Sequence, residues 1–415
     1  MLAIESASFF TFGMFIIDEV EFTDGSQRDN KIDLIGGAGT YAVLGARLAS
    51  SPDRLLSRSI SWIVDMGSDF PQQIRNTIES WNTDCNLRHN TSRLTTRAWN
   101  GYGAEELRSF EYRTPKIRLE VDDLSQSQVL SKSFHMICSS DRLLNIVEKL
   151  RLRRTSIDSE AGSPLIVWEP IPDLCNPGQL SRLQMASQLG VIISPNHAEL
   201  RSFFPPDSLG CIEQVELVKN MMQWTDEVSH CQPTTIPIIR EGANGSTAYL
   251  RHPTIKRICS IHVPAFHTAD MAGSVIDPTG GGNTYLGALA LALTDVLWEQ
   301  PTFKLISKAI GIKGLPKDLT SCLQAVENKE DFRSPHLASQ TTIAMIYATI
   351  AASFVIEQYG VPNLQQTETP CESIEYWNGE KFIDRLGIYL KREGHSVTTQ
   401  LKVSNRIMNE SFTET

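Results

Sequence analysis

A glycine triplet before an apolar run is the pattern in this sequence with the clearest chemical potential. Gly280, Gly281 and Gly282 come directly before Asn283 and a stretch rich in alanine and leucine. Glycines at the start of a helix let backbone N–H groups crowd around an anion, and the helix dipole adds partial positive charge there. A flexible turn before a packed helix is the simpler alternative. Because Asp277 and Asn283 flank the glycines, the segment favours a phosphate-binding loop.

A second candidate site lies where Asn196 and Glu199 follow an expected strand. Their spacing places both side chains in the first turn of a helix, and Pro195 fixes the entry of the chain. Amide and carboxylate oxygens in this arrangement suit Mg²⁺ held through water. The alternative is a helix cap with an acid in the first turn, which needs no ligand.

Other side chains have weaker patterns. Arg97 lies among small hydroxyl residues on an expected strand, so it belongs either to a solvated face or to a substrate phosphate or carboxylate site. Trp99 and Tyr102 would either stack on a ring-shaped substrate or pack within their own hairpin. His262 and His267 lack the spacing of metal ligands, and we assign them no role.

The elements that position these residues follow an alternating pattern. Short apolar runs rich in β-branched and aromatic residues recur with helical stretches between them, which predicts an α/β fold with a doubly wound, mainly parallel sheet. Core strands are expected at residues 9–17, 59–65, 133–138, 163–168, 191–194, 235–239 and 246–250, and helices at 39–49, 70–80, 141–153, 176–189 and 212–228.

Several segments depart from this alternation within what we interpret as one α/β domain over residues 1–415. Residues 17–36 and 91–121 have the alternation and turn residues of hairpins, which predicts a small sheet that forms either a lid over the site or a surface for a homodimer. Residues 300–340 are polar and contain proline, and we expect a surface insertion there. Residues 385–415 are expected to form a polar, frayed tail.

Composition excludes several classes of protein. Hydrophobic residues make up 41% and charged residues 21%, which is typical of a folded globular chain. The formal charge of −10 repels phosphate backbones and anionic lipids, so nucleic acid is not an expected partner. Eight cysteines without a CxxC pair favour reduced thiols and a cytoplasmic location. The apolar runs are shorter than the ~18 residues that a bilayer requires, so no membrane association is expected.

The glycine-rich segment DPTGGGN resembles the DTTGAGD signature of the PfkB-type (ribokinase-like) carbohydrate kinases. Gly13 and Asp18 are similar to the family's first motif, whose Asp binds substrate hydroxyls. The second motif, whose glycines approach the sugar, is similar to the segment that contains Gly36, Gly37 and Gly39. Local stretches resemble a fungal subgroup of the killer-virus maintenance type most closely.

Further motifs follow in the same order along residues 9–362. Arg240, Gly242 and Gly245 resemble the turn beside the nucleotide phosphates, and Asn196 with Glu199 matches the N-x-x-E motif that organises Mg²⁺ through water. The resemblance implies a ribokinase-like fold with a β-sheet lid, ATP and Mg²⁺ as cofactors, and a small sugar-like or nucleoside-like substrate. It also assigns Asp277 and Thr279 to the nucleotide site.

Three departures from the family pattern leave the expected fold unchanged but bear on the expected activity. The signature Asp that takes the proton from the attacking hydroxyl is Asn283 here, and an amide does not accept that proton at neutral pH. Arg240 replaces the usual Thr and would either pair with a phosphate or exclude the nucleotide. Tyr41 stands near the usual Asn of the second motif, where its ring would fill part of the sugar pocket.

Three hypotheses follow from these departures. The first is ATP-dependent phosphoryl transfer to a hydroxyl of the substrate, with the anion hole and Mg²⁺ compensating for a weak base. The second is a pseudokinase that binds a nucleotide or metabolite without transfer. The third is an enzyme with non-phosphoryl chemistry in the former sugar pocket.

Overall fold

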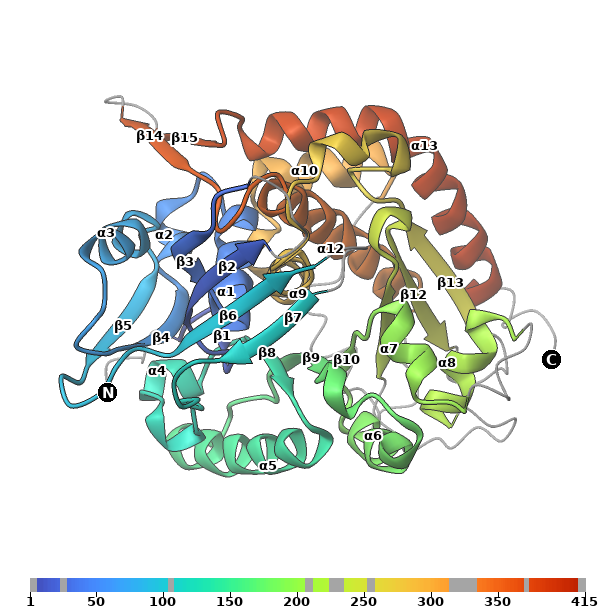
Figure 1. Cartoon of the computed structure of the whole chain (residues 1–415). Helices are drawn as coiled ribbons and strands as arrows, with labels where there is room; N and C mark the ends of the chain where they lie inside the picture. The colour runs from blue at the N-terminus through green and yellow to red at the C-terminus, as the bar shows by residue number, and fades with distance from the viewer. Residues whose placement is uncertain are drawn as a thin grey trace.

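Nine strands form the central sheet of the computed structural model, in the order β13-β12-β11-β10-β9-β8-β1-β4-β5. The structure describes residues 6–22, 28–103, 108–205, 212–223, 235–251, 258–312, 334–368 and 373–409. The strands of this sheet (Figure 1) are β1 (Phe9–Thr11), β4 (Ile60–Met66), β5 (Asp84–His89), β8 (Ser133–Cys138), β9 (Leu165–Pro170), β10 (Ile192–Ile193), β11 (Ile236–Arg240), β12 (Ser246–Arg251) and β13 (Ile258–Val263).

The pairing of the strands confirms a doubly wound, mainly parallel sheet. All neighbours from β5 to β11 are parallel, and only β11–β12 and β12–β13 are antiparallel. The central strand β9 is buried along its whole length, as expected for a parallel strand covered on both faces. The edge strand β5 was not predicted, because its residues are polar and mostly accessible.

The strand expected at residues 9–17 is divided between two sheets. β1 ends at Thr11, and β2 (Ile16–Phe22) begins a separate sheet. The chain turns between them at Gly13, where a methyl group would lie 2.5 Å from the backbone nitrogen of Gly39. This close approach of two motif glycines explains the break, which the continuous apolar run concealed.

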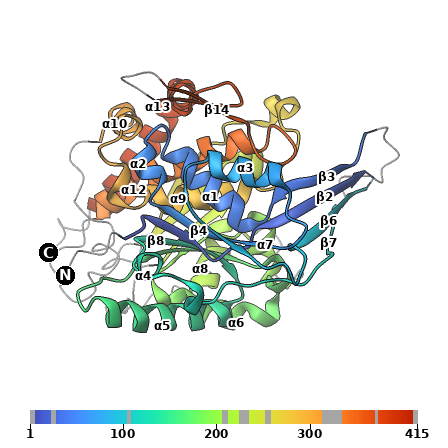
Figure 2. The same ribbon diagram turned by 90° about the vertical axis from the view of Figure 1, so that its left-hand side faces the viewer.

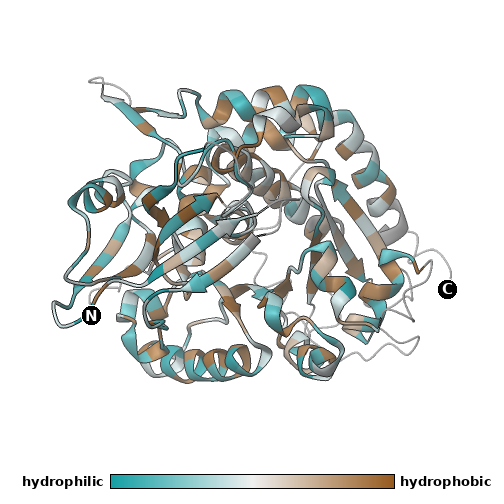
Figure 3. Ribbon diagram, viewed as in Figure 1, coloured by the Kyte–Doolittle hydropathy of each residue, from teal (hydrophilic) through white to brown (hydrophobic). Residues whose placement is uncertain are grey.

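Helices cover both faces of the central sheet (Figure 2) and enclose two hydrophobic cores. The outer helices carry hydrophilic as well as hydrophobic residues (Figure 3). One core involves α1 (Ala38–Ala49), α3 (Gln72–Ser80), α9 (Gly281–Ala292), α10 (Pro301–Ala309), α12 (Ser334–Val355) and α13 (Phe382–Asn409), with the short α2 (Arg54–Ser57) at its margin. The other involves α4 (Gln126–Val129), α5 (Ser140–Ile157), α6 (Leu180–Ala186), α7 (His197–Ser202) and α8 (Gln214–Met222).

Helix α12 is apolar on all sides because it lies inside the first core. By length and composition Leu337–Val355 could cross a membrane, with a mean hydropathy of 1.3, and it is longer than the apolar runs expected from the sequence. However, 94% of this window is buried inside the protein. Packing against α1, α9 and α13 accounts for its composition.

Two expectations about polar segments differ from the structure. The tail expected at residues 385–415 is helix α13 up to Asn409, and its Tyr389, Val397 and Leu401 are buried against the core. Widely spaced apolar residues on one helical face were hidden by the polar residues between them. The surface insertion expected at residues 300–340 begins instead with α10, whose Phe303 and Ile306 are buried. The last residues of this segment belong to α12. Residues 313–333 lie outside the described part.

The segments predicted to form a small sheet do so. β3 (Lys31–Gly36), β2, β6 (Arg97–Tyr102) and β7 (Arg108–Tyr112) pair in the order β3-β2-β6-β7, and Figure 2 shows this sheet projecting from the body. Most of the expected turn at residues 24–30 lies outside the described residues. We call this four-stranded sheet the lid. A separate hairpin consists of β14 (Leu364–Glu368) and β15 (Ser373–Trp377).

The lid is attached to the glycine-rich loop by Tyr102 at the end of β6. The Tyr102 hydroxyl donates to Asp277 Oδ1 at 3.0 Å and lies 2.9 Å from Thr279 Oγ1. Its ring also packs near Phe22 and Tyr359, with centroid distances of 5.8 and 6.5 Å. The lid therefore lies on the same side of the molecule as the glycine triplet and is closed onto it.

Helices α1 and α9 approach so closely that their backbones touch. A methyl group at Gly45 would lie 1.9 Å from the carbonyl oxygen of Thr284, and one at Gly287 would lie 1.8 Å from that of Ala42. Neither backbone atom can move aside without shifting a whole helix.

We expect Gly287→Ala to lower the melting temperature, because overpacking a core usually costs about 1–3 kcal/mol. Gly387→Ala on α13 is the matched control, since no atom lies within 4 Å of the added methyl group. The control should gain about 0.5–1 kcal/mol from helix propensity. Equal melting temperatures for the two variants would contradict the close packing of α1 and α9.

We expect Tyr102→Phe to loosen the lid without unfolding the protein. Losing a hydrogen bond of about 1 kcal/mol should speed local opening roughly fivefold. Hydrogen exchange of the backbone amides in β6 and β7 measures this change. Tyr376→Phe on β15 is the control, and unchanged exchange in the Tyr102 variant would show that the hydroxyl contacts do not hold the lid.

Candidate functional site

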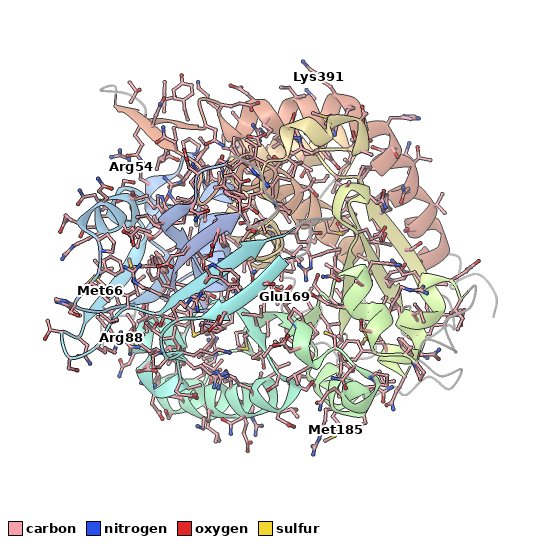
Figure 4. The ribbon with its side chains drawn as sticks, viewed as in Figure 1. Arg54, Met66, Arg88, Glu169, Met185 and Lys391 are labelled. Atoms are coloured by element: carbon pink, nitrogen blue, oxygen red, sulfur yellow. The ribbon has the colours of Figure 1, made fainter. Side chains whose placement is uncertain are left out.

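The candidate site lies at the carboxyl ends of the central parallel strands, the usual place for ligands in such sheets. Glu169 is near the end of β9, Asn196 follows β10, and Arg240 ends β11. In Figure 4, Glu169 lies near the middle of the molecule, whereas Met185 and Lys391 mark its periphery. The amino end of α9 reaches the same edge of the sheet, because Arg240 lies against Gly282.

A cavity of about 340 Å³ opens at this edge. One side is mainly apolar and the other carries polar groups and exposed backbone, a combination typical of small-molecule sites. The lining residues are Asn196, Arg240, Gly242, Ala243, Gly245, Ala265, Phe266, His267, Val275, Pro278, Gly281, Gly282, Tyr285, Thr349, Ala352, Ser353 and Ile356. The cavity volume lies at the lower end of the ~300–1,000 Å³ range of ligand pockets.

The glycine triplet forms the start of α9 as the sequence predicts. Gly280 is the cap residue and has a left-handed backbone with φ of 81°. The ring of Tyr41 packs directly on it, since a methyl group at Gly280 would lie 2.4 Å from the ring. In the first turn of α9 the Gly281 N–H donates to the Pro278 carbonyl oxygen at 3.2 Å, so the N–H groups of Gly282 and Asn283 remain for an anion.

Asn283 occupies the third position of α9, and the first turn of this helix contains no acidic residue. Its Oδ1 atom is buried and has no hydrogen-bond partner among the described residues. An amide oxygen accepts hydrogen bonds but does not take up a proton at neutral pH. This position therefore offers binding contacts and no general base.

Arg240 connects the strands of the site to α9. Its Nη2 pairs with Glu169 Oε1 and lies 3.5 Å from Glu199 Oε2, while Nε donates to the carbonyl oxygen of Ser194 at 3.2 Å. Burial opposes the charge of Arg240, but the two carboxylates outweigh it and raise its pKa. A methyl group at Gly282 would lie 2.2 Å from Nη1, so the remaining edge of the guanidinium faces the glycine triplet.

Asn196 and Glu199 are hydrogen-bonded to each other and are not arranged to bind a metal ion. Glu199 accepts from the backbone N–H and the side-chain Nδ2 of Asn196, both at 2.7 Å, and its own N–H donates to Asn196 Oδ1 at 2.8 Å. This is the capping box that we weighed as the alternative. Within the described ranges, no group of three or more His, Cys, Asp or Glu residues could hold a metal ion. The residues present do not fit the expected Mg²⁺.

The other nucleotide-site candidates divide into two sets. Gly242 and Gly245 line the cavity with φ of 59° and 94°, so a left-handed backbone is needed at both positions. Asp277 and Thr279 instead hold the lid through Tyr102, and Asp277 Oδ1 also accepts from the Thr279 N–H at 2.9 Å. Their side chains connect the glycine-rich loop to the lid.

The predicted substrate residues lie on the lid strands β2 and β3 and at the start of α1. Asp18 is buried, and a methyl group at Gly36 would lie 1.8 Å from its Oδ2 atom. Gly37 caps α1 with φ of 93°, and Gly39 packs on Gly13. Tyr41, buried between Gly280 and the carbonyl oxygens of Ile35 and Gly360, separates this region from the glycine loop.

The geometry does not support Arg97 as a substrate ligand. Its Nε donates to Asp69 Oδ2 at 2.5 Å, and its Nη1 donates to Asp33 Oδ1 at 2.8 Å. Glu19 lies 3.7 Å from the same nitrogen. With three carboxylates around it, the guanidinium fastens the lid to the body.

The sequence analysis did not name Glu169 and assigned no role to His267, yet both belong to the site. Glu169 is a charged residue within a fully buried strand, and this contrast was a usable signal because buried charges require partners. His267 lines the cavity, and its Nε2 lies 3.0 Å from Glu357 Oε1. No spacing in the sequence marked it. His262, in contrast, lies on β13 beside Thr247.

The whole chain is similar in sequence to two fungal proteins. No family model matches the chain. Protein MAK32 of Saccharomyces cerevisiae is 33% identical over 398 residues, which cover 92% of each chain. An uncharacterized protein of Schizosaccharomyces pombe is 30% identical over 395 residues, covering 93% of each chain.

Solved structures show the same fold at low sequence identity. A ribokinase from Giardia lamblia has a TM-score of 0.59, and a fructokinase with bound ATP from Xylella fastidiosa has a TM-score of 0.54. Each is 14% identical to this chain, and each match covers 93% of this chain and 99% of the other. The chain thus has the ribokinase-like fold and belongs to the same fungal family as Protein MAK32.

Proposed function

We propose that this protein binds a purine nucleotide, or a ligand of the same form, in the cavity at the start of α9 and transfers its phosphoryl group slowly or not at all. The observation that carries the proposal is Asn283, which stands at the start of α9 where no acidic residue is present. A positioned base is worth about 10²–10⁴ in rate, so its loss removes transfer before it removes binding.

The walls of the cavity support nucleotide binding. Ala352 and Ile356 near the end of α12, together with Val275 and Pro278, offer an apolar surface for a base. Gly282 and Arg240 offer hydrogen-bond donors to phosphate oxygens at the other side. When bound, ATP would supply the phosphoryl group, and the residues of this chain would hold and orient it.

Phosphoryl transfer to a sugar-like or nucleoside-like hydroxyl is the competing function. In that reaction Asp18, on lid strand β2 next to Gly36, would accept hydrogen bonds from the substrate hydroxyls. The ring of Tyr41 opposes it, because Tyr41 packs on Gly280 between the region of Asp18 and the glycine triplet. The two functions differ in whether ADP is formed.

ATP should raise the melting temperature of the full chain by mass action, with about 2.7 kcal/mol gained at a hundredfold excess over the dissociation constant. Ala352→Leu should abolish this shift by filling the cavity, whereas Ala198→Leu on the exposed face of α7 should not. Differential scanning fluorimetry measures all three proteins. No shift for the natural sequence, or equal shifts for both variants, would contradict binding in this cavity.

Asn283→Asp should raise ADP formation by at least about tenfold on a panel of sugars and nucleosides, because it restores a base at the start of α9. Asn283→Ala is the control, since it removes the amide without adding a base. The natural sequence should form no more ADP than Asn283→Ala. Rapid turnover by the natural sequence would show that another group accepts the proton and would contradict the proposal. Retained binding without any gain in the Asp variant would show that another feature limits transfer.

A further inference from the structure

The guanidinium of Arg240 lies 3.5 Å from Glu199, the acid expected to organise Mg²⁺. We propose that the guanidinium of Arg240 replaces the metal ion, so that the phosphate groups of the ligand bind to Arg240 and the start of α9 without Mg²⁺. This inference rests on the proposed function and adds the manner in which the anionic part of the ligand is held.

The contacts of Arg240 leave one edge of the guanidinium available. Nε and Nη2 are directed to Ser194, Glu169 and Glu199, and no described residue accepts a hydrogen bond from Nη1. Nη1 lies against Gly282 on the wall of the cavity. It therefore presents N–H donors beside those of the first turn of α9, and together they suit a phosphate group.

The acids that would organise a metal ion are engaged with the protein. Both oxygens of Glu199 accept hydrogen bonds from Asn196, and Oε2 also faces Arg240. Glu169 is only 7% exposed and pairs with Arg240. A metal ion would have to displace a buried guanidinium that these carboxylates already stabilise.

The charge of the site is consistent with a built-in cation. Arg240 adds one positive charge relative to the Thr of the kinase motif, and Asn283 removes one negative charge relative to the Asp. The formal charge thus rises by two units, the charge of one Mg²⁺.

The test measures ADP binding to the full chain by isothermal titration calorimetry, in excess EDTA and in excess magnesium chloride. We expect dissociation constants within about threefold of each other, since no metal takes part in the contacts. Binding that EDTA abolishes and Mg²⁺ restores would overturn the inference and leave the proposed function intact. No binding in either condition would overturn both.

Glu199→Gln distinguishes phosphate binding through Mg²⁺ from phosphate binding through Arg240, because the two predict opposite changes in ADP affinity. If Glu199 organises Mg²⁺, the variant weakens ADP binding. If Arg240 is the cation, removal of a neighbouring negative charge should strengthen binding in EDTA by up to about tenfold, while the amide still caps α7. A loss of affinity in EDTA would contradict our proposal.

Arg240→Thr should weaken ADP binding in EDTA at least about tenfold through the loss of charge-assisted hydrogen bonds. Arg88→Thr is the matched control, because Arg88 also lies between two carboxylates, Asp65 and Asp123, and is on the edge strand β5, away from Glu169 (Figure 4). If Arg240→Thr does not fold, Gly282→Ala tests the same contact, because its methyl group pushes Nη1 aside without removing charge. Unchanged affinity in a folded variant would overturn the inference.

Discussion

The buried ion cluster around Arg240 determines how the strands of the site meet α9. One guanidinium contacts the end of β9 through Glu169, the segment after β10 through Ser194 and Glu199, and the first turn of α9 at Gly282. Charges so far from water are tolerated only when they are paired, and removing one partner usually costs about 3–5 kcal/mol. The positions of these segments are therefore coupled, and the cavity exists because this cluster holds its floor in place.

The lid is held closed by contacts with the glycine-rich loop that precedes α9. Tyr102 bonds to Asp277 and Thr279, only a few residues before the triplet that faces Arg240. Arg97 fastens the base of the lid to Asp69. A ligand entering beneath the lid must break the contacts of Tyr102, whereas the cavity is lined by none of the lid residues. The two regions of a ribokinase-like site are thus separately accessible here, which agrees with binding in one region without chemistry in the other.

Local signals in the sequence predicted the backbone of the site better than its contacts. The triplet at Gly280 and the turn at Gly242 follow from glycine chemistry, and alternating apolar runs predicted the sheet and the lid strands. The ion-pair partners of Arg97 and Arg240 could not be predicted, because their carboxylates come from segments distant in the sequence. The break at Gly13 and the amphipathic face of α13 were missed since each depends on what packs against it.

Helix α12 also sets the order in which the chain can fold during synthesis. The face of α1 and α9 that it covers remains incomplete until Leu337–Val355 has been made, nearly three hundred residues after the end of α1. At ~5–20 residues per second this delay lasts roughly 15 to 60 s. During that time the growing chain exposes the apolar face of α1, and α9 with the glycine triplet is completed only about 45 residues before Leu337 is made. A chain that is still being synthesised therefore exposes apolar surface that the complete fold buries.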